Sequence, residues 1–242
     1  MTLDLKPTKK KGLSVGITSS GKKYSVRDDR GRYFTPDEWN KFMEEIRDYP
    51  RGWRCKLPEK RMIYETLLQT GGRIAEILHL KPSDVDFKRN TITLRVNPRK
   101  RRGVLKKRSP HTEGKSRTFL ISRDFIKKLK HYISENNIDR DDLIFPIGQK
   151  GIYLYMRRVL ERAGFEDAWN FSLHNIRKTT GNWLKTLGVP GTVICLRLGH
   201  DINTYIQHYS SNDIFTKQEK IEIAKILGTI YIKGDIKKYE EL

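Results

Sequence analysis

Apolar residues recur at a helical spacing over most of the chain, beginning at residue 34. In the stretch "FTPDEWNKFMEEI", Thr35 can cap a helix and Pro36 suits its first turn. The apolar residues that follow repeat every three or four positions, which predicts one buried helix face. That face comprises Trp39, Phe42, Met43 and Ile46.

The same spacing predicts further helices. One starts near Lys60 and stops at the glycine pair 71–72, and a short one over 73–80 ends before Lys81 and Pro82. The apolar face of the first comprises Ile63, Leu67 and Leu68. Later helices are expected at 123–136, 149–164, 173–187 and 190–198.

Strict alternation of apolar and polar residues replaces the helical spacing in two short segments. "NTITLRV" at 90–96 predicts a strand, and "RTFLIS" at 117–122 predicts its antiparallel mate. A long polar connection separates them, and such connections in compact domains are usually functional or disordered. The fold class is therefore α+β, mostly helical with one small antiparallel sheet.

The pattern divides the chain into three parts. Residues 1–34 form a basic N-terminal arm, with a possible hairpin in "KYSVRDDRGRYF" that turns at Asp29, Arg30 and Gly31. Residues 35–212 form the main domain, and 213–242 form a helical C-terminal tail. The tail carries an apolar stripe of Ile221, Ala224, Ile226, Leu227 and Ile230, which can fold onto its own domain or dock on a neighbouring copy.

Charge narrows the range of partners. The chain has 49 Lys and Arg against 29 Asp and Glu, a formal net charge of +20, which favours a polyanionic partner such as nucleic acid. It has no secretory signal core and no apolar run long enough to span a bilayer. We therefore expect no membrane partner. Cys55 and Cys195 lack metal-ligand or disulfide-framework spacing, which is typical of a reducing compartment, so we expect a cytoplasmic location.

Part of this charge is concentrated in the connection between the two predicted strands. Like charges so close together repel one another unless an anion lies among them, so we expect contacts to DNA phosphates. The cationic residues are Arg99, Lys100, Arg101, Arg102, Lys106, Lys107 and Arg108.

Three separate stretches carry residues suited to chemistry on a phosphate. "TGGRIAE" places Arg73 after a glycine break, with Glu76 one turn later. "SLHNIRK" places His174 and Arg177 on one helix face. "LGH" closes a helix and leaves His200 at its exit. Each stretch alone is also explained by ordinary surface pairs and helix ends.

In this order, the stretches resemble the catalytic signature of the tyrosine recombinases, the family of phage integrases and Xer-type resolvases. That signature reads roughly TG-x-R-x-x-E, H-x-L-R-H-T and LGH, with a tyrosine nine residues beyond the last histidine, here Tyr209. The likeness runs from about residue 34 to 210. It implies the tyrosine-recombinase catalytic fold and a site-specific recombinase that cleaves and rejoins double-stranded DNA, as a homotetramer on a specific site.

The resemblance also implies a role for each residue. Tyr209 is the nucleophile that forms a 3′-phosphotyrosyl link, which conserves bond energy, so neither ATP nor a metal is required. Arg73 and Arg177 bind the phosphate. His174 and His200 bond the oxyanion or take the phenolic proton. Tyr205 is a competing nucleophile whose spacing fits less well.

The family's general acid is a lysine near the hairpin turn, and here its identity stays open. Lys115 is the nearest lysine before the second strand and is our choice; it can instead simply contact phosphate. Lys106, Lys107 and His111 are the alternatives. Glu76 is expected to support its neighbours.

Other functions and arrangements remain to be distinguished. A type IB topoisomerase shares this chemistry but usually has a histidine at only one of the two positions, and an inactive DNA-binding relative would keep only the fold. Residues 1–34 are too short to be the family's second DNA-gripping domain, so the chain is a catalytic fragment or a reduced recombinase. Either predicts weak, salt-sensitive DNA binding. No cofactor and no metal are implied, because no His, Cys or carboxylate cluster has metal-ligand spacing.

Overall fold

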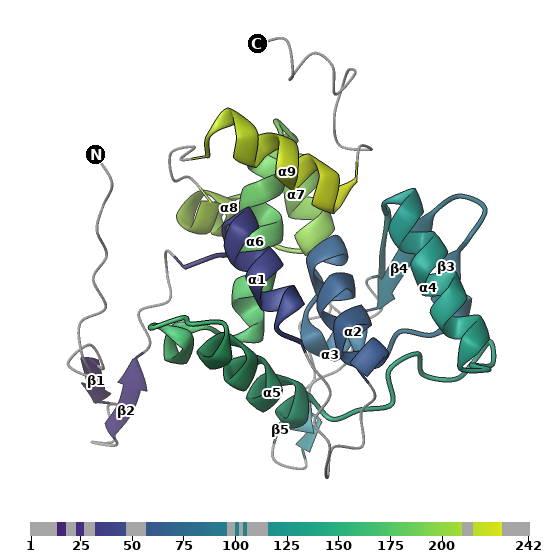
Figure 1. Cartoon of the computed structure of the whole chain (residues 1–242), viewed down its shortest axis with the longest axis horizontal. Coiled ribbons are helices and arrows are strands. Elements are labelled where there is room, and N and C mark those ends of the chain that lie inside the picture. Colours follow the sequence, from purple (N-terminus) through teal and green to yellow (C-terminus); the bar gives the residue numbers. More distant parts are fainter. Residues whose placement is uncertain are drawn as a thin grey trace.

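The computed structural model describes residues 14–17, 23–26, 32–46, 57–95, 100–101, 104–105, 116–209 and 215–228. Side chains are described for 32–46, 59–95, 116–206 and 215–228. Helices dominate these residues, with one small antiparallel sheet at one side, so the predicted α+β class is confirmed (Figure 1). Within the same residues, no helix is both long enough and apolar enough to cross a membrane.

The predicted helices are present with small shifts at their ends. Thr35 caps α1 (Pro36–Glu44) in a capping box, in which its hydroxyl accepts a hydrogen bond from the Glu38 amide. The next two are α2 (Leu57–Thr70) and the short α3 (Ile74–Ile77), which is followed by a 3₁₀ turn, η1 (Pro82–Asp84). The later ones are α4 (Arg123–Glu135), α5 (Gln149–Arg162), α6 (Leu173–Thr186) and α7 (Gly191–Leu198).

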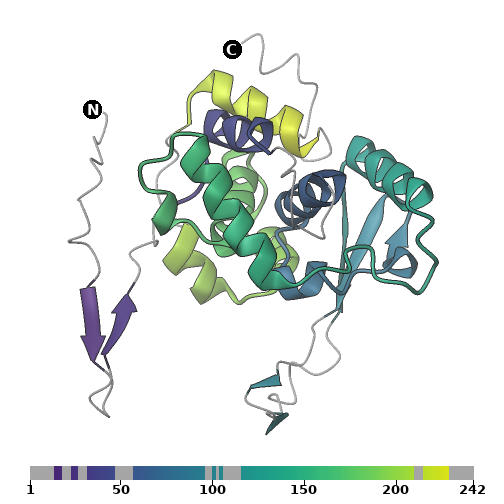
Figure 2. The ribbon, with the colours of Figure 1, turned by 60° about the horizontal axis from the view of Figure 1, so that its bottom comes forward.

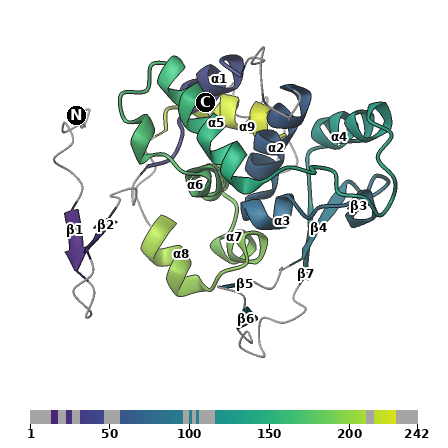
Figure 3. The same ribbon diagram turned by 90° about the horizontal axis from the view of Figure 1, so that it is seen from below.

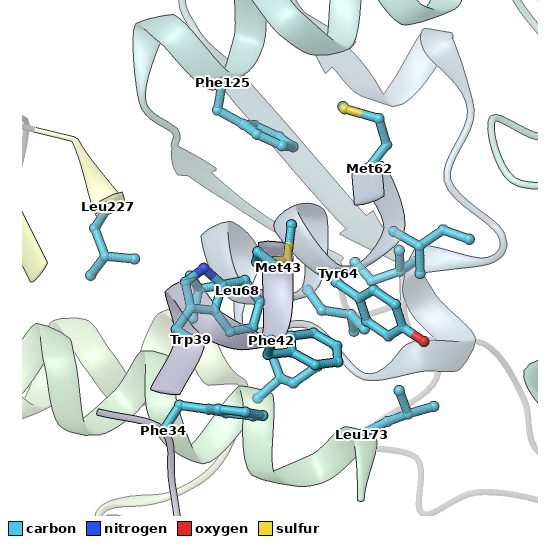
Figure 4. Packing of buried hydrophobic residues seen from close by; sticks show 14 of the residues in the cluster. Phe34, Trp39, Phe42, Met43, Met62, Tyr64, Leu68, Phe125, Leu173 and Leu227 are labelled. Carbon is cyan, nitrogen blue, oxygen red and sulfur yellow. The ribbon is translucent and has the colours of Figure 1, made fainter. Parts of the chain in front are cut away.

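The core is centred on α2 and α6 and is closed by aromatic rings from α1. The Phe34 ring lies 5.6 Å from that of Trp39 and 5.6 Å from that of Phe42, centroid to centroid (Figure 4). The Phe34 backbone is also fixed, because its amide donates to the Thr179 hydroxyl and its carbonyl accepts from the Trp183 indole. This packing fixes α6, which carries two of the predicted site residues.

The sheet has one strand more than the pattern predicts. Its order is β3-β4-β7, all antiparallel, formed by β3 (Val85–Asp86), β4 (Thr91–Arg95) and β7 (Ser116–Leu120). Ile92 and Leu94 point into the core, and α4 lies alongside the strands (Figure 2). In this register Arg117 lies opposite Leu94, and this position matters for the site.

The predicted N-terminal hairpin is wrong in its pairing. Strand β1 (Ser14–Ile17) pairs with β2 (Lys23–Val26), so residues 23–26 pair with a segment before them in the sequence and not with residues 32–34. Residues 32–34 cannot form the predicted second strand, because they are bound to the main domain. Arg32 forms ion pairs with Glu38 and Asp167, and Phe34 is fully buried.

The tail helix α9 (Lys217–Leu227) packs on its own domain, against α1 (Figure 2). Glu222 accepts a hydrogen bond of 2.7 Å from the Asn40 amide, and Ile223 is fully buried. The predicted stripe is therefore partly wrong: Ile223 belongs to it, whereas Ile221 and Ile226 are only half-buried. Residue 230 lies outside the described residues, as does the rest of 229–242.

The segment between the two predicted site residues at 200 and 209 is a helix, α8 (Ile202–Tyr209), for which the sequence pattern predicted no element. Its first turn is held by Asp201, whose carboxylate accepts a 2.7 Å hydrogen bond from the Thr204 amide. The Tyr205 ring packs beside Gly191, where an added Cβ would lie 2.8 Å from the ring. The helix is thereby fastened to the start of α7.

Candidate active site

The first part of the site is the break between α2 and α3. Gly71 has a φ of +60°, and a Cβ on Gly72 would come within 2.7 Å of Leu94, so only glycine fits this turn. Arg73 then stands at the N-terminus of α3 with extended backbone. Glu76 accepts hydrogen bonds from the Arg73 amide, at 2.8 Å, and from its Nη1, at 3.2 Å.

The second part is Arg177, on α6. The apolar side chains of this helix are buried, and Arg177 is buried with them, at 2% exposure. Its Nη1 donates to the carbonyl of Gly71 at 2.7 Å, and its Nη2 donates to the carbonyl of Leu198. These carbonyls end α2 and α7, where helices leave acceptors unpaired and carry partial negative charge. The guanidinium of Arg177 thus joins the end of α2, which is followed by Arg73, to the end of α7, which is followed by His200.

The third part is the corner after α7. Gly199 ends this helix in the left-handed conformation, with φ +65°, as predicted, and the chain then turns to His200. Burial, Arg177 and, to a lesser degree, Arg73 lower the pKa of His200 to about 4, against a weaker opposing effect of the Asp201 backbone. His200 is therefore a neutral imidazole near neutral pH.

His174 lies in the first turn of α6 with an exposed side chain. It precedes Arg177 by three residues, so both emerge on the same side of the helix. Figure 3 looks onto the part of the molecule where α3, α6 and α7 lie next to one another. His174, Arg177, Arg73 and His200 thus come from three helices that meet there.

Glu76 is the acidic partner of this group. Its carboxylate is 4% exposed and accepts two hydrogen bonds from Arg117, of 3.1 Å and 2.6 Å. Burial alone would raise the pKa of Glu76, but the bonds and charge of Arg117, together with Arg73, hold it below its usual value. Glu76 is therefore ionised near neutral pH and supports two arginines.

The two tyrosines of α8 differ in their surroundings. Tyr205 lies in the middle of the helix against Gly191, and burial raises the pKa of its phenol. Tyr209 is the last residue of α8, and its side chain lies outside the described residues.

The predicted general acid and most of the cationic connection lie outside the described residues. Lys115 directly precedes β7, and its alternatives Lys106, Lys107 and His111 are likewise not described. Two short strands of the connection, β5 (Lys100–Arg101) and β6 (Val104–Leu105), pair antiparallel, and only their backbone is described. The DNA-contact prediction for this segment stays a prediction. The residues without description are Arg99, Arg102, Lys106, Lys107 and Arg108.

Two arginines at the site were not singled out from the sequence. Arg117 alternates with Phe119 and Ile121 on the inward face of its strand, and this placement of a charge among apolar residues was the available signal. Arg197 lies one helical turn after buried Ile194 and donates to the carbonyls of Gln69 and, at 3.1 Å, Leu120. Both arginines bind groups within a few residues of Arg73 or His200.

Taken together, the geometry suits an anionic substrate. Two guanidinium groups and a neutral imidazole lie close enough to influence one another electrostatically, and one carboxylate orients Arg73. Planar arginine forks match the oxygen pairs of a phosphate. Among the described residues, no cluster of three or more His, Cys, Asp or Glu side chains could hold a metal ion.

Comparison with known proteins gives the same picture. The sequence pattern of the phage integrase family matches residues 32–214, which include the whole candidate site. No curated protein sequence matches the chain.

Several solved structures share the fold. The XerA recombinase aligns with a TM-score of 0.57 at 20% identity, over 80% of this chain and 64% of that one. The Tn1549 transposon integrase in complex with circular intermediate DNA aligns with a TM-score of 0.60 at 18% identity, over 79% and 66%. The XerH site-specific recombinase bound to palindromic difH substrate aligns with a TM-score of 0.55 at 21% identity, over 74% and 49%. The chain therefore spans between half and two thirds of these proteins.

Proposed function

Because the chain belongs to the phage integrase family, we propose that it is a tyrosine-type site-specific DNA recombinase, which cleaves and rejoins DNA through a covalent phosphotyrosyl intermediate. The observation that carries the proposal is the position of Arg177. Its guanidinium binds the chain beside both Arg73 and His200, so three separate sequence motifs meet at one place. An inactive DNA-binding relative would keep these fold contacts without the chemistry, and the trapping experiment below distinguishes it from the proposed enzyme.

The proposed reaction needs no outside energy source. The Tyr209 oxygen attacks the phosphorus, a phosphorus–oxygen bond to tyrosine forms, and the bond to the 5′-oxygen breaks. Arg73 and Arg177 stabilise the extra negative charge in the transition state. His174 can accept the phenolic proton, whereas His200, which its lowered pKa makes a weak base, can donate a hydrogen bond to the phosphate. The reverse attack by a 5′-hydroxyl restores the DNA backbone and frees the tyrosine.

The departing 5′-oxygen needs a proton, and we assign this role to Lys115. Lys115 is two residues before Arg117, which binds Glu76 at the site. This proximity in sequence favours Lys115. Its alternatives Lys106, Lys107 and His111 lie further from β7 along the chain.

The proposed partner is double-stranded DNA with a specific site, bound as a tetramer. The net charge of +20 and the cationic connection support DNA binding. The XerH and Tn1549 structures are DNA complexes, which agrees with such a partner. We assign phosphate contacts to the cationic residues 99–108, which would hold DNA without reading its sequence.

The test is covalent trapping on DNA. The chain is incubated with a library of nicked duplexes of random sequence, from which the short strand downstream of the cleaved phosphate diffuses away. Protein–DNA adducts that survive detergent are isolated, and their DNA is sequenced. We expect adducts joined at a 3′-phosphate, enriched for one sequence, and absent with Tyr209→Phe.

Tyr205→Phe is the matched control, since it removes the other phenol of the same helix and should leave adduct formation intact. An adduct that survives Tyr209→Phe and disappears with Tyr205→Phe would overturn the assignment of the nucleophile. Relaxation of a supercoiled plasmid that lacks the enriched sequence would instead support the topoisomerase alternative. A wild-type chain that forms no adduct on any duplex would contradict the proposed function.

A further inference from the structure

Arg117 is bonded to two separate parts of the candidate site. Its Nη1 and Nη2 donate to the two oxygens of Glu76, and its Nε donates to the backbone carbonyl of Arg197 at 2.8 Å. The side chain is only 12% exposed. One planar group on β7 therefore connects α3 with the last turn of α7.

Each of these contacts leads directly to a group at the site. Glu76 in turn accepts hydrogen bonds from the backbone amide and the guanidinium of Arg73. The Arg197 carbonyl lies in the last turn before Gly199 and His200, and the guanidinium itself lies against Gly199. A Cβ added to Gly199 would be 3.1 Å from Arg117 Nη1, so the absence of a side chain there leaves the space that Arg117 occupies.

We infer that Arg117 is a positioning residue, which sets the distance between the Arg73 side and the His200 side of the site. This inference rests on the proposed function, because the spacing matters for catalysis only if both groups act on one phosphate. The Arg117 guanidinium binds no substrate in this role. It acts through Glu76 and through the end of α7.

The charges argue against a purely local role. Glu76 is buried and forms ion pairs with Arg117 and Arg73, so without Arg117 it keeps the ion pair with Arg73, whose side chain is 38% exposed. A buried carboxylate with one partner instead of two would draw that partner toward itself. Arg73 would then turn away from the phosphate position. The segment at Gly199 and His200, without the bond from Arg117 to the Arg197 carbonyl, would become more exposed to water.

A chemically matched arginine elsewhere provides the control. Arg162 also binds both a carboxylate and a backbone carbonyl, those of Glu45, at 3.0 Å and 2.9 Å. It joins α5 to the end of α1 and contacts none of the predicted catalytic residues in these bonds. Arg162→Met therefore removes the same kind of bridge without disturbing the site.

The first measurement needs no DNA. His200 is titrated by NMR in the wild type and in Arg117→Met, Arg117→Lys and Arg162→Met, with its signal assigned by its loss in His200→Gln. The imidazole of the wild type has a pKa of about 4, lowered by burial, Arg177 and Arg73, with Asp201 opposing. We expect it to rise by about one pH unit in Arg117→Met and to stay unchanged in Arg162→Met.

Arg117→Lys separates position from charge, because lysine keeps the charge but cannot reach both Glu76 oxygens and the Arg197 carbonyl. A pKa of His200 that stays raised in Arg117→Lys supports the positioning role. Restoration of the wild-type value by lysine, or no rise in Arg117→Met, would overturn it. Urea unfolding checks that each variant is folded. If Arg117→Met is not folded, the titration is compared between the wild type and Arg117→Lys alone.

The second measurement follows single-turnover adduct formation on the enriched nicked duplex. We expect at least a tenfold loss of rate in both Arg117 variants and less than a twofold loss in Arg162→Met. A wild type without any adduct refutes the proposed function while the titration still answers the positioning question. An Arg117→Met rate equal to that of the wild type would refute the positioning role alone.

Discussion

At the scale of single residues, the site is organised by arginines that bind backbone carbonyls. Arg177 and Arg197 are both buried, and both donate hydrogen bonds to carbonyls at the ends of helices and strands. These bonds join segments that are far apart in the sequence. Burial of His200, together with the charge of Arg177, lowers the pKa of its imidazole.

The lowered pKa of His200 predicts a specific acid sensitivity. In the unfolded chain a histidine has a pKa near 6.5, whereas folded His200 has one of about 4. Between these values the unfolded state binds a proton that the folded state does not, so the free energy of unfolding falls as the pH falls through this window. The loss is complete only below the folded pKa.

The measurement is urea unfolding of the wild type and of His200→Gln, from about pH 7 to about pH 4.5. Because Gln does not titrate, we expect the variant to lose less stability than the wild type over this range. His131→Gln is the control, since its ring is exposed on α4. Equal acid sensitivity in the wild type and His200→Gln would show that the imidazole is not held neutral.

Most of these site residues were predicted from the sequence, whereas Arg117 was not, and the difference has a physical reason. Arg73, His174, Arg177 and His200 stand in local motifs whose helix ends and glycines are readable from the pattern. Arg117 has no such motif, and its partners lie 41 and 80 positions away in the chain. Long-range pairing of this kind depends on how the sheet meets α3 and α7. A one-dimensional pattern does not contain that information.

At the scale of elements, the end of α7 is where the helix contacts Arg117 of the sheet. Gly199 and Gly188 both follow helices, both have positive φ, of +65° and +78°, and both are exposed. They differ in their surroundings, because an added Cβ at 199 meets the Arg117 guanidinium while one at 188 meets nothing within 4 Å. This pair separates backbone strain from the effect of the contact.

We expect Gly188→Ala to lower the free energy of unfolding by about 1 kcal/mol, from the strained backbone alone. Gly199→Ala should lose more, because Arg117 must also move. Only Gly199→Ala should slow adduct formation on the enriched nicked duplex, by at least tenfold. Urea unfolding and single-turnover kinetics check both expectations; equal kinetics in the two variants would show that the corner tolerates displacement of Arg117.

The sequence pattern gave the long helices accurately and missed several short elements, among them β3 and α8. Strand β3 has only two residues, too few for alternation to be visible. Helix α8 was not predicted, because its residues, "INTYIQHY", include polar and β-branched positions with weak helix preference. The Asp201 cap is a local feature, whereas the packing of Tyr205 against Gly191 is a tertiary contact that the pattern does not contain.

At the scale of the whole molecule, the helical body and the cationic connection have separate tasks. The body carries the groups proposed for chemistry, whereas the connection between β4 and β7 carries a concentration of Lys and Arg residues in the sequence. If the connection binds phosphates, its removal should change the affinity for all DNA sequences alike. The salt dependence of binding measures the number of such contacts directly.

The final prediction compares two variants of equal charge. Lys100, Arg101 and Arg102 are replaced by Gln in one, and Lys127, Lys128 and Lys130 on the exposed side of α4 are replaced in the other. Fluorescence anisotropy with a random-sequence duplex, between about 50 and 200 mM salt, gives the slope of log affinity against log salt. We expect the first variant to reduce this slope by about 2.7, that is 0.9 for each lost phosphate contact, and the second to leave it nearly unchanged. Equal slopes in the two variants would mean that net charge alone attracts the DNA and that the cationic residues of the connection do not contact its phosphates.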